Sequence, residues 1–188
     1  RLTVTNQGSE AADLHLLPSL WFRNTWDWGD EDSVRPRIRL VDGAVVSDAL
    51  QGLASYNISC RDPGTWLFTE NETNPERLYN QSLRQPFVKD AFHRYLIEGQ
   101  TDAVNPIREG TKAALHLQRH LEPGEVWQVN LRLCRHDHHG AKAPDPMESA
   151  PVEAILSQRR QDWEDYLSWI APGLSQDDRA IHATAAAG

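Results

Sequence analysis

Cysteine is scarce in this sequence, and long apolar runs are missing altogether. The two cysteines, Cys60 and Cys134, are too few for a disulfide scaffold, and we expect both to be buried free thiols. Nowhere do about 18 apolar residues follow one another, the length that a helix needs to cross a bilayer. We therefore predict a protein that has no membrane partner.

Basic clusters and a leader pattern are missing as well. The net charge is -8, and no stripe of lysines and arginines runs along the chain. This argues against a nucleic-acid partner, because affinity for phosphates depends on clustered basic side chains. No basic segment followed by an apolar one resembles a signal peptide, and we expect a cytoplasmic protein.

The composition that remains is ordinary for a soluble globular protein. The chain has 188 residues, of which 39% are hydrophobic and 24% charged. This length allows one sizeable core, or a core with an appendage. Such a composition argues against disorder of the whole chain.

Turn residues and period-2 alternation predict an all-β region over 1–135. Asp42-Gly43 is a strong hairpin signal, because both central positions of a type I′ turn need positive φ. Several short strands without helical periods between them favour an antiparallel β-sandwich over a parallel sheet. We predict strands near 1–6, 12–18, 35–41, 44–49, 53–60, 65–70, 92–98, 111–121 and 125–135.

The pattern changes after Cys134. Residues 136–150 are rich in Pro, Gly and charge and predict a loop or linker. Residues 151–170 carry apolar side chains at helical spacing and predict one amphipathic helix. Ser175, with Asp178 three residues later, predicts the N-cap of a further helix. Because a strand pattern is already under way at Arg1 and this last helix has barely begun at the C-terminus, we expect a fragment of a longer polypeptide.

A histidine-rich stretch raises the possibility of a metal site. His136, Asp137, His138 and His139 are residue types that bind zinc. Adjacent residues seldom converge on one ion without distant ligands, and no second cluster is evident. We therefore favour a solvated loop and predict no metal cofactor.

Two glutamates stand in the sequence "FTENETN", residues 68–74. On a strand, Glu70 and Glu72 would share a face at roughly 7 Å, a distance compatible with the two carboxyls of an inverting glycosidase. Such enzymes usually take the pair from separate elements on opposite sides of the substrate, which makes strand neighbours a poor acid and base. Hydrogen bonding to a sugar or to a neighbouring domain is one alternative, and satisfaction of loop backbone is the other.

Three tryptophans lie within residues 20–32, "LWFRNTWDWGDED". Trp21, Trp26 and Trp28 could be core residues, since aromatic side chains bury large areas. Aromatic rings beside Arg23 and Asn24 are equally typical of carbohydrate binding, where a ring covers the C–H face of a pyranose. We expect Trp21 and Phe22 to lie mainly in the core and the stretch from Arg23 to Trp28 to form a surface.

Several longer stretches, taken together, resemble a known family. "LHLLPSLWFRNTWDWG", "LFTENETN", "PFVKDAFHRYL" with "AVNP", and "GTKAALH" are similar to successive blocks of bacterial glucosidase-like enzymes related to glycoside hydrolase family 63, of the mannosylglycerate hydrolase or glucosidase type. The blocks stand in the same order and cover most of residues 1–121. The later helix and "LSQDDRAIHATAAAG" resemble the passage from the N-terminal β-sandwich of this group into its catalytic barrel.

The resemblance implies a retained fold without the catalytic centre. Relatives consist of a β-sandwich followed by an (α/α)6 barrel and hydrolyse α-glucosidic or similar linkages with inversion and without a metal cofactor. The acid and base belong to the barrel, so no residue here is assigned as catalytic. By this reading, 151–170 is a linker helix and 171–188 the truncated start of the helical catalytic domain.

The same resemblance selects residues that would face the barrel or a carbohydrate substrate. The stronger candidates come from the tryptophan and glutamate stretches, and the weaker ones from "VKD" and "GTK". They are Arg23, Asn24, Trp26, Trp28, Glu70, Asn71, Glu72 and Asn74, followed by Lys89, Asp90 and Lys112.

Three hypotheses about function remain open from the sequence. The first is a non-catalytic N-terminal domain of a glycoside hydrolase, which braces the barrel or walls the substrate cleft. The second is an autonomous carbohydrate-binding module with exposed rings. The third is a small metal-binding domain that uses the histidine-rich loop, which would make its stability depend on zinc.

Overall fold

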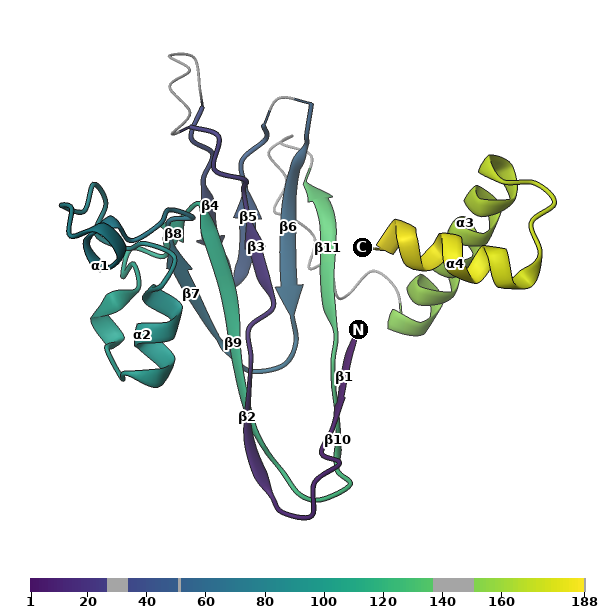
Figure 1. The fold of residues 1–188 in the computed structure, drawn as a ribbon, viewed down its shortest axis with the longest axis horizontal. Helices are drawn as coiled ribbons and strands as arrows, with labels where there is room; N and C mark the ends of the chain where they lie inside the picture. Colours follow the sequence, from purple (N-terminus) through teal and green to yellow (C-terminus); the bar gives the residue numbers. More distant parts are fainter. Residues whose placement is uncertain (27–33, 51, 137–150, 188) are drawn as a thin grey trace. The chain divides into compact units, whose positions relative to one another are not determined.

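A computed structural model describes residues 1–26, 34–50, 52–136 and 151–187 (Figure 1). The chain forms two compact units, Arg1–Pro146 and Met147–Gly188. The first unit is mainly β, with antiparallel strand pairs and short helices, and the second is helical. The predicted predominance of antiparallel β structure is confirmed, as is a helix near the C-terminus.

The largest sheet has five strands in the order β11-β6-β5-β4-β8. Its members are β4 (Ile38–Val41), β5 (Ala44–Ser47), β6 (Ser55–Cys60), β8 (Glu109–Gly110) and β11 (Leu131–His136). The hairpin between β4 and β5 turns at Asp42 and Gly43, whose φ angles are 49° and 85°. Both angles are positive, and the predicted two-residue turn is confirmed.

A second sheet is organised around the long strand β9 (Lys112–Leu121). Its neighbours are β2 (Ala12–Leu16), β3 (Ser19–Trp21) and β7 (Thr65–Thr69). The β3 and β7 strands both pair with the first part of β9, and β2 pairs with the last part. In this register Lys112 lies between Trp21 and Thr69.

A third strand pair consists of β1 (Leu2–Thr5) and β10 (Val126–Val129). The predicted strand 125–135 is therefore two strands, since β10 pairs with β1 and β11 pairs with β6. Gly124, with φ 77°, lies in the predicted Pro123-Gly124 turn before β10.

Short helices follow β7. They are α1 (Pro75–Tyr79), α2 (Ala91–Ile97) and the 3-10 turn η1 (Thr101–Ala103). The predicted strand 92–98 is wrong, because this stretch is α2. Ala91, Phe92 and Tyr95 recur at helical spacing, and Phe92 and Tyr95 pack with Leu67 and Ala114 of the second sheet.

Two hydrophobic clusters join strands of different sheets. One contains Ile38 and Val45 from the five-stranded sheet together with Phe68 and Ala113 from the second sheet. The other combines β9 residues such as Leu117 with β10 residues, with further side chains from β1 and β2 packed against it. The apolar faces of these antiparallel strands are therefore shared between sheets, as expected for strands that alternate between core and solvent.

The second unit contains α3 (Val152–Ile170) and α4 (Gln176–Ala187). The Ser175 hydroxyl oxygen accepts a hydrogen bond from the Asp178 backbone N–H at 3.2 Å, and the hydroxyl donates to the Asp178 carboxylate at 2.6 Å. The predicted N-cap is therefore present. Arg179 of α4 donates a hydrogen bond to the Ser168 hydroxyl of α3 at 3.3 Å.

Cys60 and Cys134 are both free and half-buried. They lie on neighbouring strands but pair with Leu131 and Asn57, respectively, rather than with each other. The prediction of free thiols is confirmed, with less complete burial than expected. Among the helices that the structure describes, none has the length and apolar character to span a membrane.

Candidate functional site

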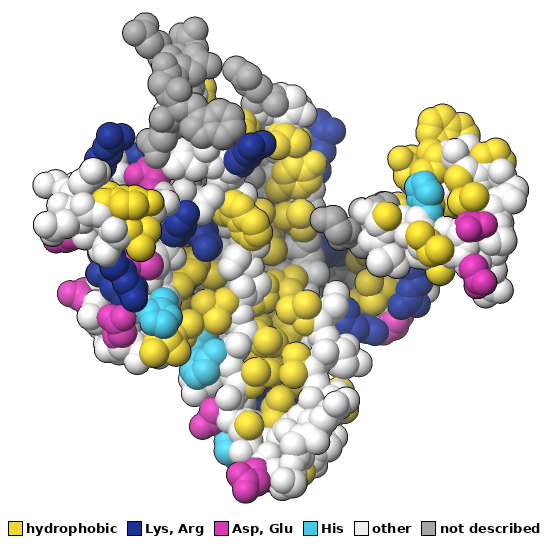
Figure 2. Space-filling model, in the orientation of Figure 1, with side chains coloured by type: hydrophobic (Ala, Val, Ile, Leu, Met, Phe, Trp, Pro, Cys, Tyr) yellow, Lys and Arg dark blue, Asp and Glu magenta, His cyan; other side chains and the backbone are white. Residues whose placement is uncertain are grey.

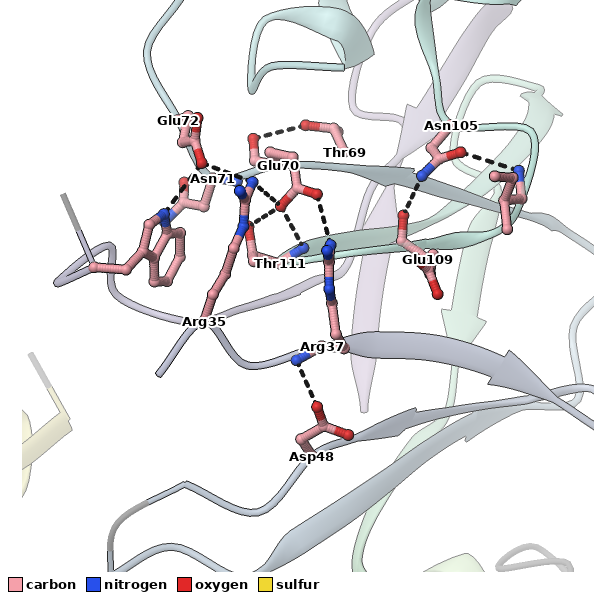
Figure 3. A network of polar contacts seen from close by, with 12 residues as sticks. Arg35, Arg37, Asp48, Thr69, Glu70, Asn71, Glu72, Asn105, Glu109 and Thr111 are labelled. Atoms are coloured by element: carbon pink, nitrogen blue, oxygen red, sulfur yellow. Dashed lines mark hydrogen bonds and ion pairs between the residues drawn. The ribbon is translucent and has the colours of Figure 1, made fainter. Parts of the chain in front are cut away.

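The loop that follows β7 places two buried carboxylates beside the same arginine (Figure 3). Glu70 and Glu72 are only 6% and 7% exposed. The Nη2 atom of Arg35 lies 2.9 Å from Oε2 of Glu70 and 2.7 Å from Oε1 of Glu72. These contacts are ion pairs whose N–H directions do not satisfy hydrogen-bond geometry. Arg35 therefore bridges the two glutamates.

Glu70 is held by further donors from two other strand segments. Nη1 of Arg37 donates to its Oε1 atom at 2.9 Å. The backbone N–H and the hydroxyl of Thr111 donate to its Oε2 atom at 3.1 and 2.8 Å. Asp48 in turn accepts a hydrogen bond from the Arg37 backbone N–H at 2.9 Å. Both oxygens of Glu70 are thus occupied by donors of the same chain (Figure 3).

Glu72 connects this group to the tryptophan stretch. The indole Nε1 of Trp26 donates to Oε1 of Glu72 at 3.1 Å. The guanidinium carbon of Arg35 lies 5.8 Å from the centroid of the Trp26 ring, within the range of a cation–π contact. We call Trp26, Arg35, Arg37, Glu70, Glu72 and Thr111 the carboxylate cluster.

The charges of the carboxylate cluster balance, and this limits its chemistry. Two carboxylates face two guanidiniums, so the cluster presents no net charge to a ligand. A glycosidase acid must be protonated and reach the leaving oxygen, whereas Glu70 and Glu72 are buried acceptors bound to cations. The arrangement favours a positioning role that joins separate chain segments.

Further hydrogen bonds, most of them between backbone groups, connect other segments to the carboxylate cluster. Phe22 N–H donates to the Thr111 carbonyl at 3.0 Å, and the Asn71 side chain donates to the Phe22 carbonyl at 2.9 Å. Glu70 N–H donates to the Phe87 carbonyl at 2.6 Å. Gly110 passes so close to the Thr69 carbonyl that a Cβ atom would overlap it. A glycine is therefore required where β8 passes the end of β7.

A second polar group lies at the start of α2. Asn74 caps α1 by accepting the Arg77 backbone N–H at 3.0 Å, and its amide donates to Asp90 at the same distance. Nη1 of Arg77 lies 3.5 Å from the Asp90 carboxylate. Asn74 and Asp90 therefore connect α1 with α2. This contact does not involve the carboxylate cluster.

Lys112 lies against an aromatic ring on the α2 side of the second sheet. Its Nζ atom is 5.2 Å from the centroid of Phe92. Burial, with a smaller contribution from the charge of Lys89, lowers the pKa of Lys112 below its ordinary value. Within the described part of the chain, neither lysine forms an ion pair with a carboxylate. The backbone N–H of Lys89 donates a hydrogen bond to the Glu72 carbonyl at 3.0 Å, which joins the segment before α2 to the carboxylate cluster.

The tryptophan stretch divides in an unexpected way. Trp21 is 56% exposed, so the expectation that it belongs to the core is wrong. It lies opposite Lys112, on the β9 face whose side chains point away from the shared core. Phe22 does pack against a core cluster. Arg23 is exposed, Asn24 and Trp26 are half-buried, and Trp28 lies outside the described residues.

Sequence reasoning selected Glu70, Glu72 and Trp26 but missed the cations that hold them. Arg35, Arg37 and Arg39 recur with period 2 before and within β4, which could have indicated one polar strand face with several guanidiniums. Their pairing with a loop some 33 residues away could not be deduced from that spacing alone.

The described residues provide no set of ligands for the predicted alternative of a metal-binding domain. Among them, no group of three or more His, Cys, Asp or Glu side chains is placed to hold an ion. The residues 137–139 of the histidine-rich stretch lie outside the described part of the chain.

Among known proteins, the chain is similar to a much longer yeast protein. No family model matches the chain, and no solved structure matches it. The chain is 26% identical over 203 residues to the uncharacterized protein YMR196W of Saccharomyces cerevisiae. The match covers 92% of this chain and 19% of that protein, so the chain spans about a fifth of the length of this relative.

Proposed function

We propose that this chain is the non-catalytic N-terminal region of a larger glycoside hydrolase of the α-glucosidase type. It braces a helical catalytic domain, the (α/α)6 barrel, and contributes side chains to the wall of the carbohydrate cleft. The acid and base of the reaction belong to that domain. The likeness to a much longer yeast protein supports a role as part of a larger polypeptide.

One observation carries the proposal. The separate stretches that resemble the glucosidase family converge on one region of the fold. Hydrogen bonds join them in pairs: Phe22 with Thr111, Trp26 with Glu72, Glu70 with Phe87 and Asn105 with Phe68. A set of distant segments held together by buried polar contacts is expected where a surface must keep a defined shape.

We also propose that the β region is a sandwich and that α4 belongs to the start of the barrel. The cluster of Ile38, Val45, Phe68 and Ala113, which combines both larger sheets, supports the sandwich. The exposed aromatic side chains of α3, among them Tyr166 and Trp169, support a helical neighbour for the second unit.

The test compares hydrolysis of a panel of α-glucosides by the 188-residue chain and by the full-length protein of the same gene. We expect activity in the full-length protein alone. In that protein, Arg23→Ala should raise KM, because Arg23 is exposed in the segment that leads to Trp26 of the carboxylate cluster. Arg119→Ala, on the far part of β9, is the matched control and should leave KM unchanged.

Activity of the 188-residue chain itself would refute the proposal, as would a full-length protein that hydrolyses no glycoside. Equal effects of Arg23→Ala and Arg119→Ala would exclude a contribution of this surface to the cleft.

A second candidate function is an autonomous carbohydrate-binding module. The exposed indole of Trp21 favours it, because a solvent-exposed ring can cover the C–H face of a pyranose. This function requires that the isolated 188-residue chain bind glucosides in a calorimetric titration. It also requires that Trp21→Ala abolish the binding. Absence of binding would leave the first proposal as the better account.

A further inference from the structure

The outward face of the β9 sheet carries histidine side chains that the proposed function does not use (Figure 2). Two of them, His15 of β2 and His116 of β9, contact each other directly. Nδ1 of His15 lies 2.8 Å from Nε2 of His116, and the ring planes are inclined by 15° with centroids 5.1 Å apart. Two imidazole nitrogens thus face one another at the molecular surface.

The strand register explains why the rings meet. His15 is opposite Gln118, and His116 lies two residues before Gln118 on β9, which makes the histidines a diagonal cross-strand pair. Long side chains at such positions are within reach of each other. Tyr95 of α2 contacts His116 as well, with the two ring planes at 83° and the centroids 6.2 Å apart. The pair is therefore held by a sheet and a helix.

From this geometry we infer that His15 and His116 form a surface site for Cu²⁺, with water completing the coordination. Imidazole is a good ligand for copper, nickel and zinc. At metal–nitrogen bonds of about 2.0 Å, ligands at a right angle are roughly 2.8 Å apart, and tetrahedral ligands roughly 3.3 Å apart. The two nitrogens are 2.8 Å apart in a hydrogen-bonded contact, so a small movement of the rings brings them to either separation. Among divalent first-row metals, Cu²⁺ binds such imidazole donors most tightly.

Binding needs a rearrangement of protons and rings but no other reactant. In the present contact, one facing nitrogen carries a proton and donates it to the other nitrogen. For copper to bind, this proton must move to the remaining nitrogen of the same ring, so that both facing nitrogens offer a lone pair. Each ring must also rotate, so that its lone pair points to the metal. Neutral imidazoles release no net proton in this exchange.

The experiment uses the 188-residue chain with His138→Gln and His139→Gln, because the imidazoles of the histidine-rich stretch would compete for copper. Calorimetric titration with Cu²⁺ and electron paramagnetic resonance are the readouts. We expect one Cu²⁺ per chain, bound by two nitrogen ligands and more tightly than Zn²⁺. His15→Gln and His116→Gln should each weaken binding on the order of tenfold or more.

His120→Gln is the matched control. His120 is exposed on the same strand face, but its ring contacts Asp13 at 2.8 Å and does not contact the pair, so copper binding should persist. Circular dichroism establishes that each variant folds. If His116→Gln unfolds, His15→Gln still tests the site, because His15 is exposed and its replacement should leave the fold intact. The inference fails if both variants bind Cu²⁺ as tightly as the parent chain. It also fails if Zn²⁺ binds as tightly as Cu²⁺.

Discussion

The indole of Trp26 donates a hydrogen bond to the carboxylate of Glu72, which is 46 residues further along the chain. The same carboxylate oxygen lies 2.7 Å from Arg35, and the Arg35 guanidinium also lies near the Trp26 ring. One glutamate thus ties the tryptophan stretch to the arginines before β4. This contact explains why a stretch with aromatic and polar character is neither entirely core nor entirely surface.

Replacing Trp26 should reveal the value of this hydrogen bond. Trp26→Phe retains an aromatic ring but removes the N–H donor. We expect the free energy of unfolding to fall by about 1 to 2 kcal/mol, because hydrogen bonds to charged groups contribute more than neutral ones. Urea denaturation followed by circular dichroism measures the change.

Trp21→Phe is the control for this prediction. It makes the same chemical change at a side chain that is mostly exposed, and its cost should stay within about 0.5 kcal/mol. Equal costs at the two positions would show that the Trp26 hydrogen bond contributes nothing measurable.

Removal of the Glu70 carboxylate should destabilise the fold more strongly. Glu70→Ala leaves Arg35 and Arg37 without their shared partner and the Thr111 donors without an acceptor. The arginines are partly exposed, so water screens part of the loss, and we expect about 3 kcal/mol in urea denaturation. Glu98→Ala, which removes a carboxylate 3.9 Å from the exposed His93 ring, should cost about 0.5 kcal/mol or less.

A double-mutant cycle separates the ion pair from the general effect of burial. Glu70→Ala should lower the free energy of unfolding by about 1 kcal/mol less in an Arg37→Met background. In that background Arg37 is no longer present as a cation that has lost its partner. Strict additivity of the two substitutions would show that Glu70 and Arg37 do not interact energetically.

Lys112 should titrate below the ordinary lysine range. Burial disfavours its charged form, and Lys89 adds a smaller repulsion. Reductive methylation with isotope-labelled methyl groups lets NMR follow each lysine separately. Lys89→Gln should raise the pKa of Lys112 only in part, since burial persists. A Lys112 pKa at the ordinary lysine value would contradict this prediction.

The sign of the linked stability follows from the direction of that shift. The pKa of Lys112 is lower in the folded than in the unfolded chain, so protonated Lys112 costs stability. The cost is fully present below the folded pKa and disappears as pH rises through the folded value to the unfolded one. Lys112→Met should therefore stabilise the protein at neutral pH, and this gain should vanish in alkaline solution.

Local sequence patterns predicted most of the elements correctly. The hairpin at Asp42-Gly43 and the cap at Ser175 depend on one turn or one hydrogen bond, and both are present in the structure. The stretch 92–98 was assigned as a strand because short apolar runs fit either period. The helix is selected by tertiary packing, because Phe92 and Tyr95 then both lie on the face that packs with Leu67 and Ala114.

The sequence by itself determined the antiparallel β character, the helix over Val152–Ile170 and the free cysteines, because each follows from neighbouring residues or from composition. Only the tertiary structure decided that Glu70 and Glu72 are buried with Arg35, that Trp21 is exposed, and that His15 meets His116. These relationships depend on strand register and on contacts between distant segments. Side-chain periodicity states which face a residue occupies, but not which residue it will meet there.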